Sequence, residues 1–599
     1  MPVITASKTQ PAYDVVIVGS GAGGGQSAYT LAMAGAKVLV LEAGRHYDPV
    51  RETPMFQENF RAPLRGADTA QKPFGFYDAT IAGGWTMPGE PYTNARGESE
   101  RQFDWWRTRM LGGRTNHWGR IALRNGPYDF KPRNRDGLGV DWPIGYADLA
   151  PYYDRVERLI GVYGSNEGLE NTPNSPQGVL LPPPKARVGE LLAQNRAKQL
   201  GIPIIPAHRA VLSRAQDAAT LPALIHPGDP RAQRILGEAM RGRAPCFWAT
   251  PCGRGCAIKA NYQSTTVHFP PALATGNLDI LPDAMVREVT LDKSGRADGV
   301  SYVNAVTGQE GRVRGRVIVL AASAVATARI LLCSQSARFP QGLANRSGKV
   351  GKGLMDTVGA SVGGQVPLLE NLPPHNEDGA GGDHMYSPWW LYREQRAGQL
   401  DFPRGYHIEF RTGRAMPGAD AFNGLSRHTG GSYGRQLKED ARRFYGSFLG
   451  FSGRGEMIPN DDCFCELDPV VKDKWGIPAI RFHWKWSEHE IRQVAHMQKS
   501  FGDIIEAMGG TVTSKPTPPA LAIERGGRII HEVGGTVMGT DPATSVTNSW
   551  CQTWDAKNLF IADGGPFCSN ADKNPTLTIM ALAWRTSDHI LEEMQKGNI

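Results

Sequence analysis

Three glycines near the start of the chain are spaced to hold a dinucleotide. Gly19, Gly21 and Gly24 form a Gly-x-Gly-x-x-Gly motif between an expected strand and an expected helix. Such glycines permit a tight turn, a close approach of the backbone to a pyrophosphate, and close packing of the helix, whose N-terminus faces the anion. Glu42 ends the next expected strand, where a carboxylate can accept from ribose hydroxyls and disfavours a 2′-phosphate. The motif predicts a dinucleotide site rather than a structural glycine-rich turn, and it does not separate FAD from NAD.

Three cysteines within eleven positions form a second candidate site. Cys246, Cys252 and Cys256 are separated by short segments that include two glycines. Thiolates at such spacing can surround an iron–sulfur cluster, and three of them suffice for a [3Fe–4S] centre. Two alternatives stay open, namely a structural zinc ion completed by a histidine from elsewhere and three free thiols in a loop. The other five cysteines are expected to be ordinary buried thiols.

Four further segments resemble a known enzyme family. They are the His-Glu-Val-Gly-Gly-Thr segment 531–536, the segment 558–564, the Asn-Pro-Thr segment 574–576, and the Gly-Gly-Arg-Thr-Asn-His-Trp-Gly segment 112–119. Their order resembles the glucose-methanol-choline (GMC) family of FAD oxidoreductases. The segment 112–119 is similar to a flavin-contacting stretch of sugar-oxidising members. The cysteine segment is similar to one in glucoside 3-dehydrogenases and, more loosely, in FAD glucose dehydrogenases and the large subunits of gluconate dehydrogenases.

The resemblance implies a fold and a set of site residues. The expected α/β fold has a Rossmann-like FAD-binding domain, with a βαβ unit and a parallel sheet, and an α+β substrate domain with an antiparallel sheet. His531 and Asn574 are implied to be the catalytic residues that face the flavin. The residues implied to bind FAD are Gly19, Gly21, Gly24, Glu42, Gly113, Arg114, Asn116, His117, Trp118, Val286, Asp563, Pro575 and Thr576. Whether His117 is joined covalently to the 8α-methyl group of FAD stays open. A [3Fe–4S] cluster on the three cysteines is the second implied cofactor.

Alcohol oxidation would give the two catalytic residues separate tasks. A neutral histidine can take the hydroxyl proton, while flavin N5 accepts the hydride from carbon. An asparagine amide can position the substrate and stabilise the developing alkoxide. We therefore expect His531 to act as the base and Asn574 as the positioning and stabilising group.

The elements that must position these residues are distributed over the whole chain. The pattern predicts strands at 14–18, 37–42 and 316–321, and helices at 26–34, 324–334 and 579–594. A capping box at 487–490 predicts another helix through residue 508. Because no linker is visible, we expect discontinuous domains. We expect the FAD-binding domain to consist of three parts: residues 12–175, residues 246–354, which include the cysteine segment, and residues 525–599, which include the catalytic part. The substrate domain is expected at 355–524, and 176–245 is expected to be an excursion between parts of the FAD-binding domain.

Composition and charge exclude several functions. The chain has 599 residues and a formal net charge of +7, and its basic residues form no block, so a nucleic-acid partner is not expected. No uninterrupted apolar run is long enough for a membrane span. The segment 1–13 lacks the apolar core of a signal peptide. We therefore expect a cytoplasmic protein, or a periplasmic one if a partner subunit carries the export signal.

The resulting hypothesis is an FAD-dependent dehydrogenase for a sugar or glycoside. It would oxidise a secondary hydroxyl, with C3 of a glucoside as the leading position, and pass electrons to an acceptor other than oxygen. The resemblance implies a cytochrome or quinone as acceptor and a small accessory subunit. The alternative within enzymes is a GMC oxidase or dehydrogenase for a non-sugar alcohol, for example an aromatic one. Two further hypotheses propose a function other than catalysis. The chain would be either a flavin-binding subunit that serves electron transfer or assembly, or a non-enzymatic NAD-binding module.

Overall fold

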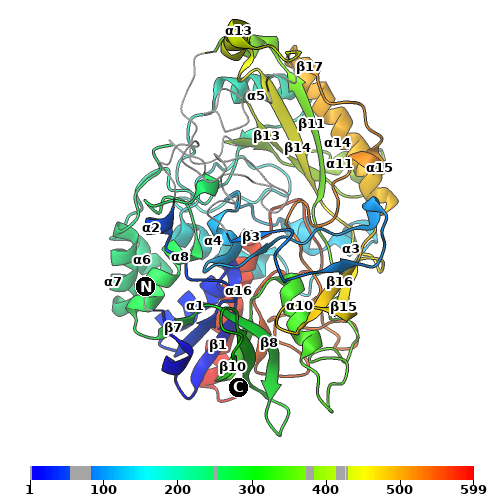
Figure 1. Cartoon of the computed structure of the whole chain (residues 1–599). Coiled ribbons are helices and arrows are strands. Elements are labelled where there is room, and N and C mark those ends of the chain that lie inside the picture. The colour runs from blue at the N-terminus through cyan, green and yellow to red at the C-terminus, as the bar shows by residue number, and fades with distance from the viewer. Residues whose placement is uncertain (1–2, 54–81, 249–251, 373–383, 413–424, 426–428) are drawn as a thin grey trace.

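The structure is a computed structural model that describes residues 3–53, 82–248, 252–372, 384–412, 425 and 429–599. Two sheets dominate it, and Figure 1 shows one in the lower half of the molecule and the other in the upper half. Both termini lie beside the lower sheet, so the beginning and the end of the chain build the same half. The fold class predicted from the sequence is confirmed.

The lower sheet has a parallel centre. Its parallel strands lie in the order β7 (Leu278–Leu281), β2 (Val38–Leu41), β1 (Tyr13–Val18), β10 (Glu310–Leu320) and β18 (Leu559–Ile561). The strands β1, β2, β7 and β18 are rich in Val, Ile and Leu and almost wholly buried, and so is the end of β10 at 317–320, as a parallel sheet covered on both faces requires. The first half of β10 pairs antiparallel with β9 (Ala297–Asn304), which forms a hairpin with β8 (Ala284–Leu291). This confirms the expected βαβ unit.

Two helices from opposite ends of the chain pack together beside this sheet. They are α1 (Ala22–Met33) and α16 (Thr576–Gln595), and α4 (Tyr146–Ile160) packs on α16. The first helix begins four residues before its expected start, because glycines 23–25 belong to its first turn. A Cβ atom at Gly23 would lie 1.6 Å from the carbonyl oxygen of Ala562. Glycine there lets α1 approach the C-terminal segment closely.

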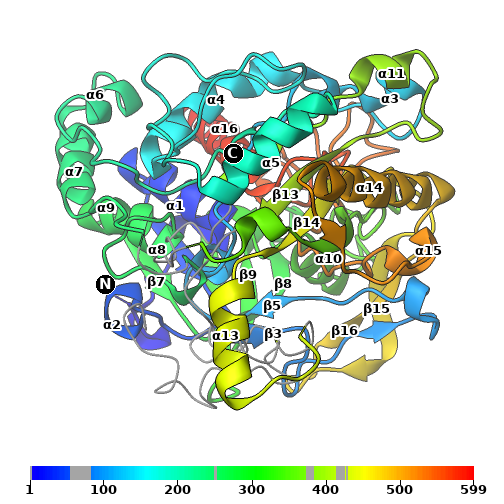
Figure 2. The ribbon, with the colours of Figure 1, turned by 90° about the horizontal axis from the view of Figure 1, so that it is seen from above.

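The upper sheet is antiparallel. Its six strands lie in the order β17 (Thr511–Val512), β11 (Val358–Gln365), β14 (Phe448–Gly455), β13 (Tyr406–Arg411), β12 (Met385–Ser387) and β6 (Ile205–Pro206). One face is covered by α14 (Glu488–Ala507), which contacts β11, β14 and β17 and runs beside β11 in Figure 1 and beside β14 in Figure 2. The helix begins with the predicted capping box, in which Glu490 accepts from the backbone N–H of Ser487 at 2.8 Å.

A smaller sheet and two short strands connect the halves. The smaller sheet has three strands, β15 (Phe464–Lys472), β16 (Pro478–His483) and β4 (Thr93–Asn94). The two short strands are β3 (Gly83–Gly84) and β5 (Arg107–Thr108), which pair with each other. In α10 (Ala324–Cys333) the expected helix after β10 is confirmed. Residues 54–81, which precede β3, lie outside the described part of the chain.

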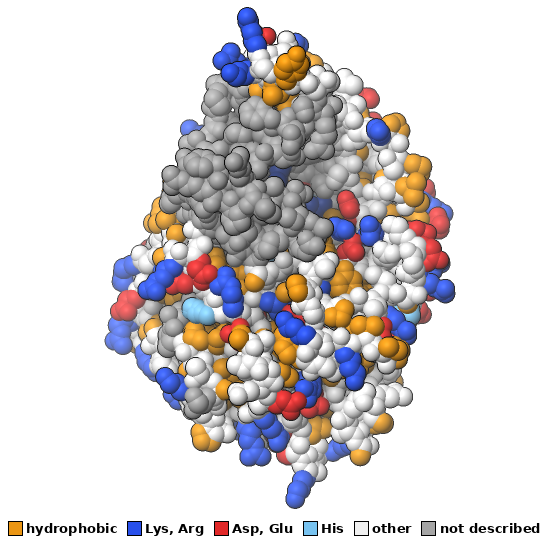
Figure 3. Space-filling view, viewed as in Figure 1, with side chains coloured by type: hydrophobic (Ala, Val, Ile, Leu, Met, Phe, Trp, Pro, Cys, Tyr) orange, Lys and Arg blue, Asp and Glu red, His pale blue; other side chains and the backbone are white. Residues whose placement is uncertain are grey.

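Basic and acidic side chains are mixed on one face of the molecule. Figure 3 shows Lys and Arg side chains interspersed with Asp and Glu on the face in view, without an expanse of one sign. None of the helices in the described part of the chain has both the length and the apolar character needed to cross a bilayer.

Candidate active site

The site is a cavity of about 370 Å³ at the carboxyl ends of the parallel strands. It is bordered by the residues that follow β1, β2 and β10, by the segment 105–121, and by the segments 529–532, 563–564 and 574–579. In open α/β sheets, ligands bind at this edge. The cavity therefore lies where a dinucleotide is expected, and it is built from both ends of the chain.

The three motif glycines have different local tasks. Gly19 has a φ of +102°, and a Cβ atom there would lie 2.3 Å from the carbonyl oxygen of Ala321. A Cβ atom at Gly24 would lie 2.0 Å from the carbonyl oxygen of Gly19, so this glycine permits contact between helix and turn. At Gly21 an added Cβ would meet no protein atom within 4 Å, and this residue is the N-cap of α1 without a capping side chain. The open space and free N–H groups fit a pyrophosphate.

Glu42 lies buried at the end of β2 and borders the cavity. Its carboxylate accepts hydrogen bonds from the backbone N–H of Ser20 at 3.3 Å and of Gly44 at 2.8 Å, and from the Ser20 hydroxyl. Burial raises the pKa of Glu42, although these donors partly oppose the shift. The carboxylate is thus fixed beside the glycine turn, as the ribose-binding role requires.

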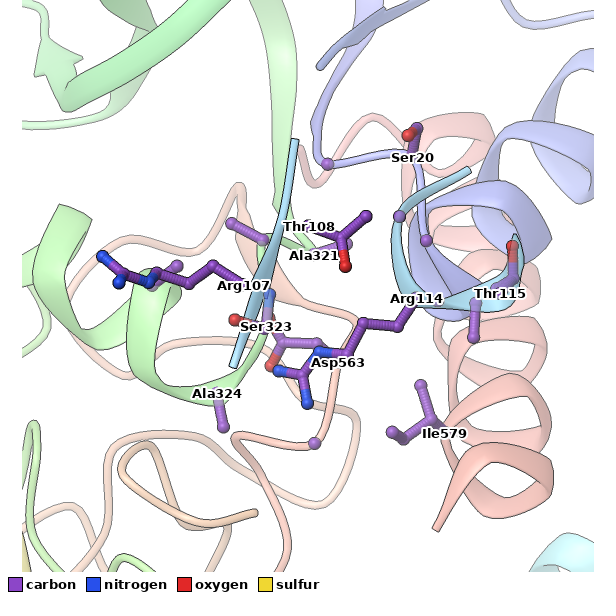
Figure 4. Close-up of a pocket in the computed structure, with 18 of the residues that line it drawn as sticks. Ser20, Arg107, Thr108, Arg114, Thr115, Ala321, Ser323, Ala324, Asp563 and Ile579 are labelled. Carbon is purple, nitrogen blue, oxygen red and sulfur yellow. The ribbon is translucent and has the colours of Figure 1, made fainter. Parts of the chain in front are cut away.

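A second carboxylate lies on the opposite wall. Asp563 accepts from the backbone N–H groups of Ser323 at 3.1 Å and Gly565 at 2.8 Å, and from the Thr327 hydroxyl at 2.5 Å. Burial raises its pKa to about 6. Figure 4 shows the side chain of Arg114 extending toward Asp563 across this part of the cavity. Three donors, two at the start of α10 and one from the residue after Gly564, hold Asp563 in place.

His531 borders the cavity as a neutral base. Its Nδ1 lies 3.2 Å from Thr357 Oγ1 and its Nε2 lies 3.4 Å from Asn574 Nδ2. Because an amide nitrogen can only donate, Nε2 must carry the lone pair and Nδ1 the proton, which it donates to Thr357. Desolvation, reinforced by the nearby Arg454, lowers the pKa of His531 to about 3. The imidazole can therefore accept a proton at Nε2.

The amide of Asn574 is oriented by a carboxylate from the upper sheet. Its Nδ2 donates to Glu409 Oε1 at 3.4 Å, while Oδ1 is buried and has no hydrogen-bond partner within the described ranges. Glu409 also contacts His407 Nε2 at 3.2 Å and pairs with Arg454 at 3.0 Å. Burial opposes ionisation of Glu409, but Arg454 and His407 outweigh it and hold its pKa below the ordinary value.

The upper sheet supplies residues for which no sequence pattern indicates a role. Glu409 and Arg454 were expected only as members of a substrate domain that also contains Trp389, Trp390 and Tyr406. Those three aromatic side chains pack with one another and with His496 of α14, away from the catalytic pair. Side chains alternate along β13, so Tyr406 and Glu409 lie on opposite faces of the strand. This alternation is the sequence signal that could have distinguished Glu409 from the aromatic residues.

Most of the residues predicted to bind FAD border the cavity. These are Gly19, Gly21, Glu42, Gly113, Arg114, His117, Trp118, Val286, Asp563, Pro575 and Thr576, and the predicted catalytic pair His531 and Asn574 borders it too. Two predicted residues do not. Gly24 packs against the turn, as described above, and Asn116 lies behind the segment, where its Nδ2 donates to the carbonyl of Leu111 at 2.9 Å. Trp105, Trp106 and Ser323 also border the cavity, and no sequence pattern indicated them.

His117 is buried beside Thr108. Its Nε2 lies 2.9 Å from Thr108 Oγ1. Desolvation, and then the nearby Arg120 and Arg114, lower its pKa to about 3, so the ring is neutral. A neutral ring is compatible both with a covalent flavin bond and with simple packing, and the bond stays a prediction.

The cysteine segment lies behind the stretch 117–120. Cys252 and Cys256 are buried and Cys246 is half-buried, and residues 249–251 between them lie outside the described part. Burial raises the pKa of Cys252, while Arg120 and Arg209 oppose the shift. Among the described residues, no group of three or more His, Cys, Asp or Glu side chains converges as a metal-ion site. The iron–sulfur cluster on these three cysteines stays a prediction.

Comparisons with known proteins agree with this geometry. Two family models described as GMC oxidoreductase match residues 232–358 and 459–583. A 2-methyl-1,2-propanediol dehydrogenase from Mycolicibacterium austroafricanum is 29% identical, over 96% of this chain and 95% of the relative. The fructose dehydrogenase large subunit of Gluconobacter japonicus is 28% identical, over 98% of both. A solved formate oxidase from Aspergillus oryzae RIB40 shares the fold, with a TM-score of 0.63 and 15% identity over 98% of this chain and 99% of that one.

Proposed function

The chain belongs to the GMC oxidoreductase family, and we propose that it is a dehydrogenase that oxidises a secondary hydroxyl group of a sugar or glycoside. Membership makes it an FAD enzyme that acts on CH–OH groups. Within that class we propose oxidation at C3 of a glucoside to a keto sugar, with transfer of the electrons to an acceptor other than oxygen.

The observation that carries the proposal is the position of the His531–Asn574 pair. Both side chains border the same cavity as the glycine turn. The imidazole is neutral, and its Nε2 lone pair lies 3.4 Å from the Asn574 amide. A hydroxyl oxygen that displaces this weak contact could donate its proton to His531 and accept from Asn574. The two groups would thus hold one hydroxyl between them.

The chain's own groups account for the proton. Nε2 of His531 takes the hydroxyl proton, and its Nδ1–H stays directed at Thr357, which keeps the tautomer fixed. The Asn574 amide donates to the oxygen as negative charge develops there. When bound, FAD supplies the hydride acceptor for the carbon-bound hydrogen. Proton and hydride then leave the substrate in different directions, and a ketone is formed.

The sugar preference has its own support. The name of the 28% identical relative specifies fructose, and Glu409 and Arg454 next to Asn574 offer an acceptor and a donor for additional hydroxyl groups. The second candidate function is oxidation of a small diol or another non-sugar alcohol. The 29% identical 2-methyl-1,2-propanediol dehydrogenase favours it.

Electron transfer and assembly are part of the proposal. A relative named as a large subunit supports an accessory subunit, with a cytochrome or quinone as acceptor. We propose that Cys246, Cys252 and Cys256 carry a [3Fe–4S] cluster on the electron route. The buried guanidinium of Arg120, electrostatically coupled to Cys252 and Cys256, would offset negative charge there. We also propose a cytoplasmic location, or a periplasmic one if the chain is exported together with the partner subunit.

Anaerobic stopped-flow reduction of the flavin tests the proposed substrate. The panel contains methyl glucoside, glucose, fructose, a 1,2-diol and an aromatic alcohol, each mixed with the FAD-loaded protein. The proposal expects the fastest bleaching with a sugar or glycoside, and product analysis should find a ketone. Faster reduction by the diol or the aromatic alcohol than by every sugar would reject the sugar assignment while leaving the enzyme class intact.

Two analyses of the purified protein test the cofactors. Iron and sulfide should be present, and a Cys252→Ser variant should lose both. Acid precipitation distinguishes the two states of His117, because covalently bound flavin stays with the pellet and free flavin stays in solution. Protein without iron that still reduces its acceptor at full speed would remove the cluster from the mechanism.

A further inference from the structure

The upper sheet has a polar face on the side away from α14. On β13, Tyr406 points to the helix, where its hydroxyl lies 2.8 Å from His496 Nδ1. Side chains alternate along a strand, so Glu409 points to the other face. On β14, Phe451 stacks on Phe501 of α14, and its neighbour Ser452 points to the same face as Glu409. The apolar face of the sheet thus packs on α14, whereas the polar face points away from this helix.

Four residues on this face form a continuous chain of contacts that starts at the catalytic pair. Asn574 Nδ2 donates to Glu409 Oε1 at 3.4 Å, and Glu409 pairs with Arg454 at 3.0 Å. Arg454 then donates to Ser452 Oγ at 2.6 Å, and Ser361 Oγ donates to Ser452 Oγ at 3.1 Å. We call Glu409, Arg454, Ser452 and Ser361 the outer polar row.

The register of the strands gives the row its length. Glu409 is paired with Ser452 across β13 and β14, and Ser452 is paired with Ser361 across β14 and β11. Neighbouring strands lie about 4.8 Å apart, so the row extends for roughly 10 Å from Glu409 to Ser361. That distance is longer than a single sugar ring.

The row also leads from the buried site to the surface. Asn574 is buried, Glu409, Arg454 and Ser452 are half-buried, and Ser361 is exposed. Beside Ser452 on the same face, with one residue between them, lies the exposed Gly450, where an added Cβ would meet no atom within 4 Å. Exposure therefore rises step by step along the row, and the neighbouring glycine leaves space above the sheet.

We infer that the outer polar row is a binding site for the second unit of a neutral glycoside whose first unit is oxidised at His531. The inference rests on the proposed sugar oxidation and adds the substrate class. The carboxylate accepts from sugar hydroxyl groups, and the two serine hydroxyls accept from them or donate to them. Arg454 and Glu409 neutralise each other, so the row matches an uncharged polyhydroxylated ligand better than a sugar acid. The enzyme therefore acts on disaccharides or larger glycosides in preference to free monosaccharides.

The test compares two substrates that share the reacting unit. Flavin reduction is measured anaerobically with methyl β-glucoside and with cellobiose, on the wild type and on the Ser452→Val and Ser361→Ala variants. We expect cellobiose to give the higher kcat/KM on the wild type. Loss of one neutral hydrogen bond corresponds to about 1 kcal/mol, or roughly a fivefold loss in kcat/KM. That loss should be clearly larger for cellobiose than for the methyl glucoside in both variants.

The control is Ser301→Val. Ser301 is also a half-buried strand serine bonded to a glutamate, Glu288, at 2.9 Å, but it lies on β9, away from the row. This variant should retain the wild-type ratio between the two substrates. Ser361 is exposed, so its alanine variant remains informative if Ser452→Val fails to fold.

Different failures have different meanings. If glucosides are oxidised but cellobiose is no better than the methyl glucoside, or both substrates suffer equally in the variants, the outer polar row is not a glycoside site and the proposed function stands. If no sugar reduces the flavin while a diol or an aromatic alcohol does, the proposed function falls, and this inference falls with it.

Discussion

At the scale of single residues, the arrangement around His531 fixes both its position and its protonation. Its backbone N–H donates to Asp356 at 2.9 Å, and this buried carboxylate also accepts from Gly527 at 2.7 Å. The ring is oriented by Thr357 on one side and Asn574 on the other. Because backbone and ring are held separately, a change at the ring should leave the segment in place.

The first prediction concerns the loss of this ring. His531→Ala should retain FAD, since the glycine turn and Glu42, which border the same cavity, are unchanged in this variant. Flavin reduction should slow by a factor on the order of 10²–10⁴, as expected when a general base is removed. Stopped-flow bleaching measures the rate. His589→Ala is the matched control, because His589 stacks on Trp550 and does not border the cavity. Reduction at wild-type speed in His531→Ala would remove the base role.

The second prediction concerns pH. Burial lowers the pKa of His531 to about 3, so the neutral base persists as pH falls from 8 to 5 and is lost only near the lowered value. We therefore expect kcat/KM for flavin reduction to show no decline centred at the ordinary histidine pKa of about 6.5. Rates in buffers of constant ionic strength check this. An acid limb near 6.5 that is absent in His531→Ala would show that the imidazole is solvated.

The sequence could identify this pair only through its family resemblance. Nothing in spacing alone brings residues 531 and 574 together, and no pattern joins either of them to Glu409 or Thr357. The glycine motif is different, because its local geometry follows from the three residues themselves. Residues held by local backbone constraints were thus predictable one by one, whereas contacts between distant segments were not.

At the scale of elements, the turn between β1 and α1 separates two roles of glycine. A Cβ atom at Gly24 would lie 2.0 Å from the Gly19 carbonyl oxygen, so Gly24→Ala forces the helix away from the turn. A Cβ atom at Gly21 meets no protein atom within 4 Å. The same methyl group should therefore damage the fold at one position and only the cofactor site at the other.

The third prediction compares these variants. Gly24→Ala should lower the thermal midpoint of the FAD-free protein, because main-chain atoms must shift. Gly21→Ala should leave that midpoint near the wild-type value and weaken FAD binding, since its methyl group occupies the space proposed for the pyrophosphate. Differential scanning fluorimetry and FAD titration measure the two effects. Equal FAD affinity for Gly21→Ala and the wild type would place the pyrophosphate elsewhere.

The elements themselves were largely predictable, and their ends were not. Buried runs such as Val15–Val18 and the capping box at Ser487 determine their structure locally, and the expected strands and helices are found there. The start of α1 was placed too late, because glycines normally disfavour a helix interior, and here contact with Ala562 and Gly19 reverses that preference. The short strands β3, β4 and β5 carry too few residues for any pattern.

At the scale of the whole molecule, the cavity depends on the meeting of the two ends of the chain. The glycine turn and the segment 113–118 come from the first part, and the segments 531–532 and 563–579 come from the last. The parallel pairing of β10 with both β1 and β18 brings these parts together. Discontinuous domains were predicted because no linker is visible. Which side chains join the two ends could not be predicted, since an ion pair leaves no trace in sequence spacing.

One such ion pair joins residues 418 positions apart. Arg114 binds Glu532 through two hydrogen bonds, one of them 2.8 Å long, and the Glu532 side chain is 1% exposed. Glu532 directly follows His531, so the pair fixes the catalytic segment on the segment that borders the cavity. Removing one partner leaves the other charge buried and unpaired, which commonly costs about 3–5 kcal/mol.

The fourth prediction is therefore a double-mutant cycle on unfolding. Arg114→Met and Glu532→Met should each lower the urea midpoint strongly, toward the lower end of that range because Arg114 remains 27% exposed. The double variant should lose clearly less than the sum, since no unpaired charge remains and methionine fills apolar space. Arg435→Met is the control, because Arg435 is 92% exposed in its pair with Glu439 and should not shift the midpoint measurably. Additive losses in the cycle would mean that the ends of the chain are joined by packing, with the ion pair contributing nothing specific.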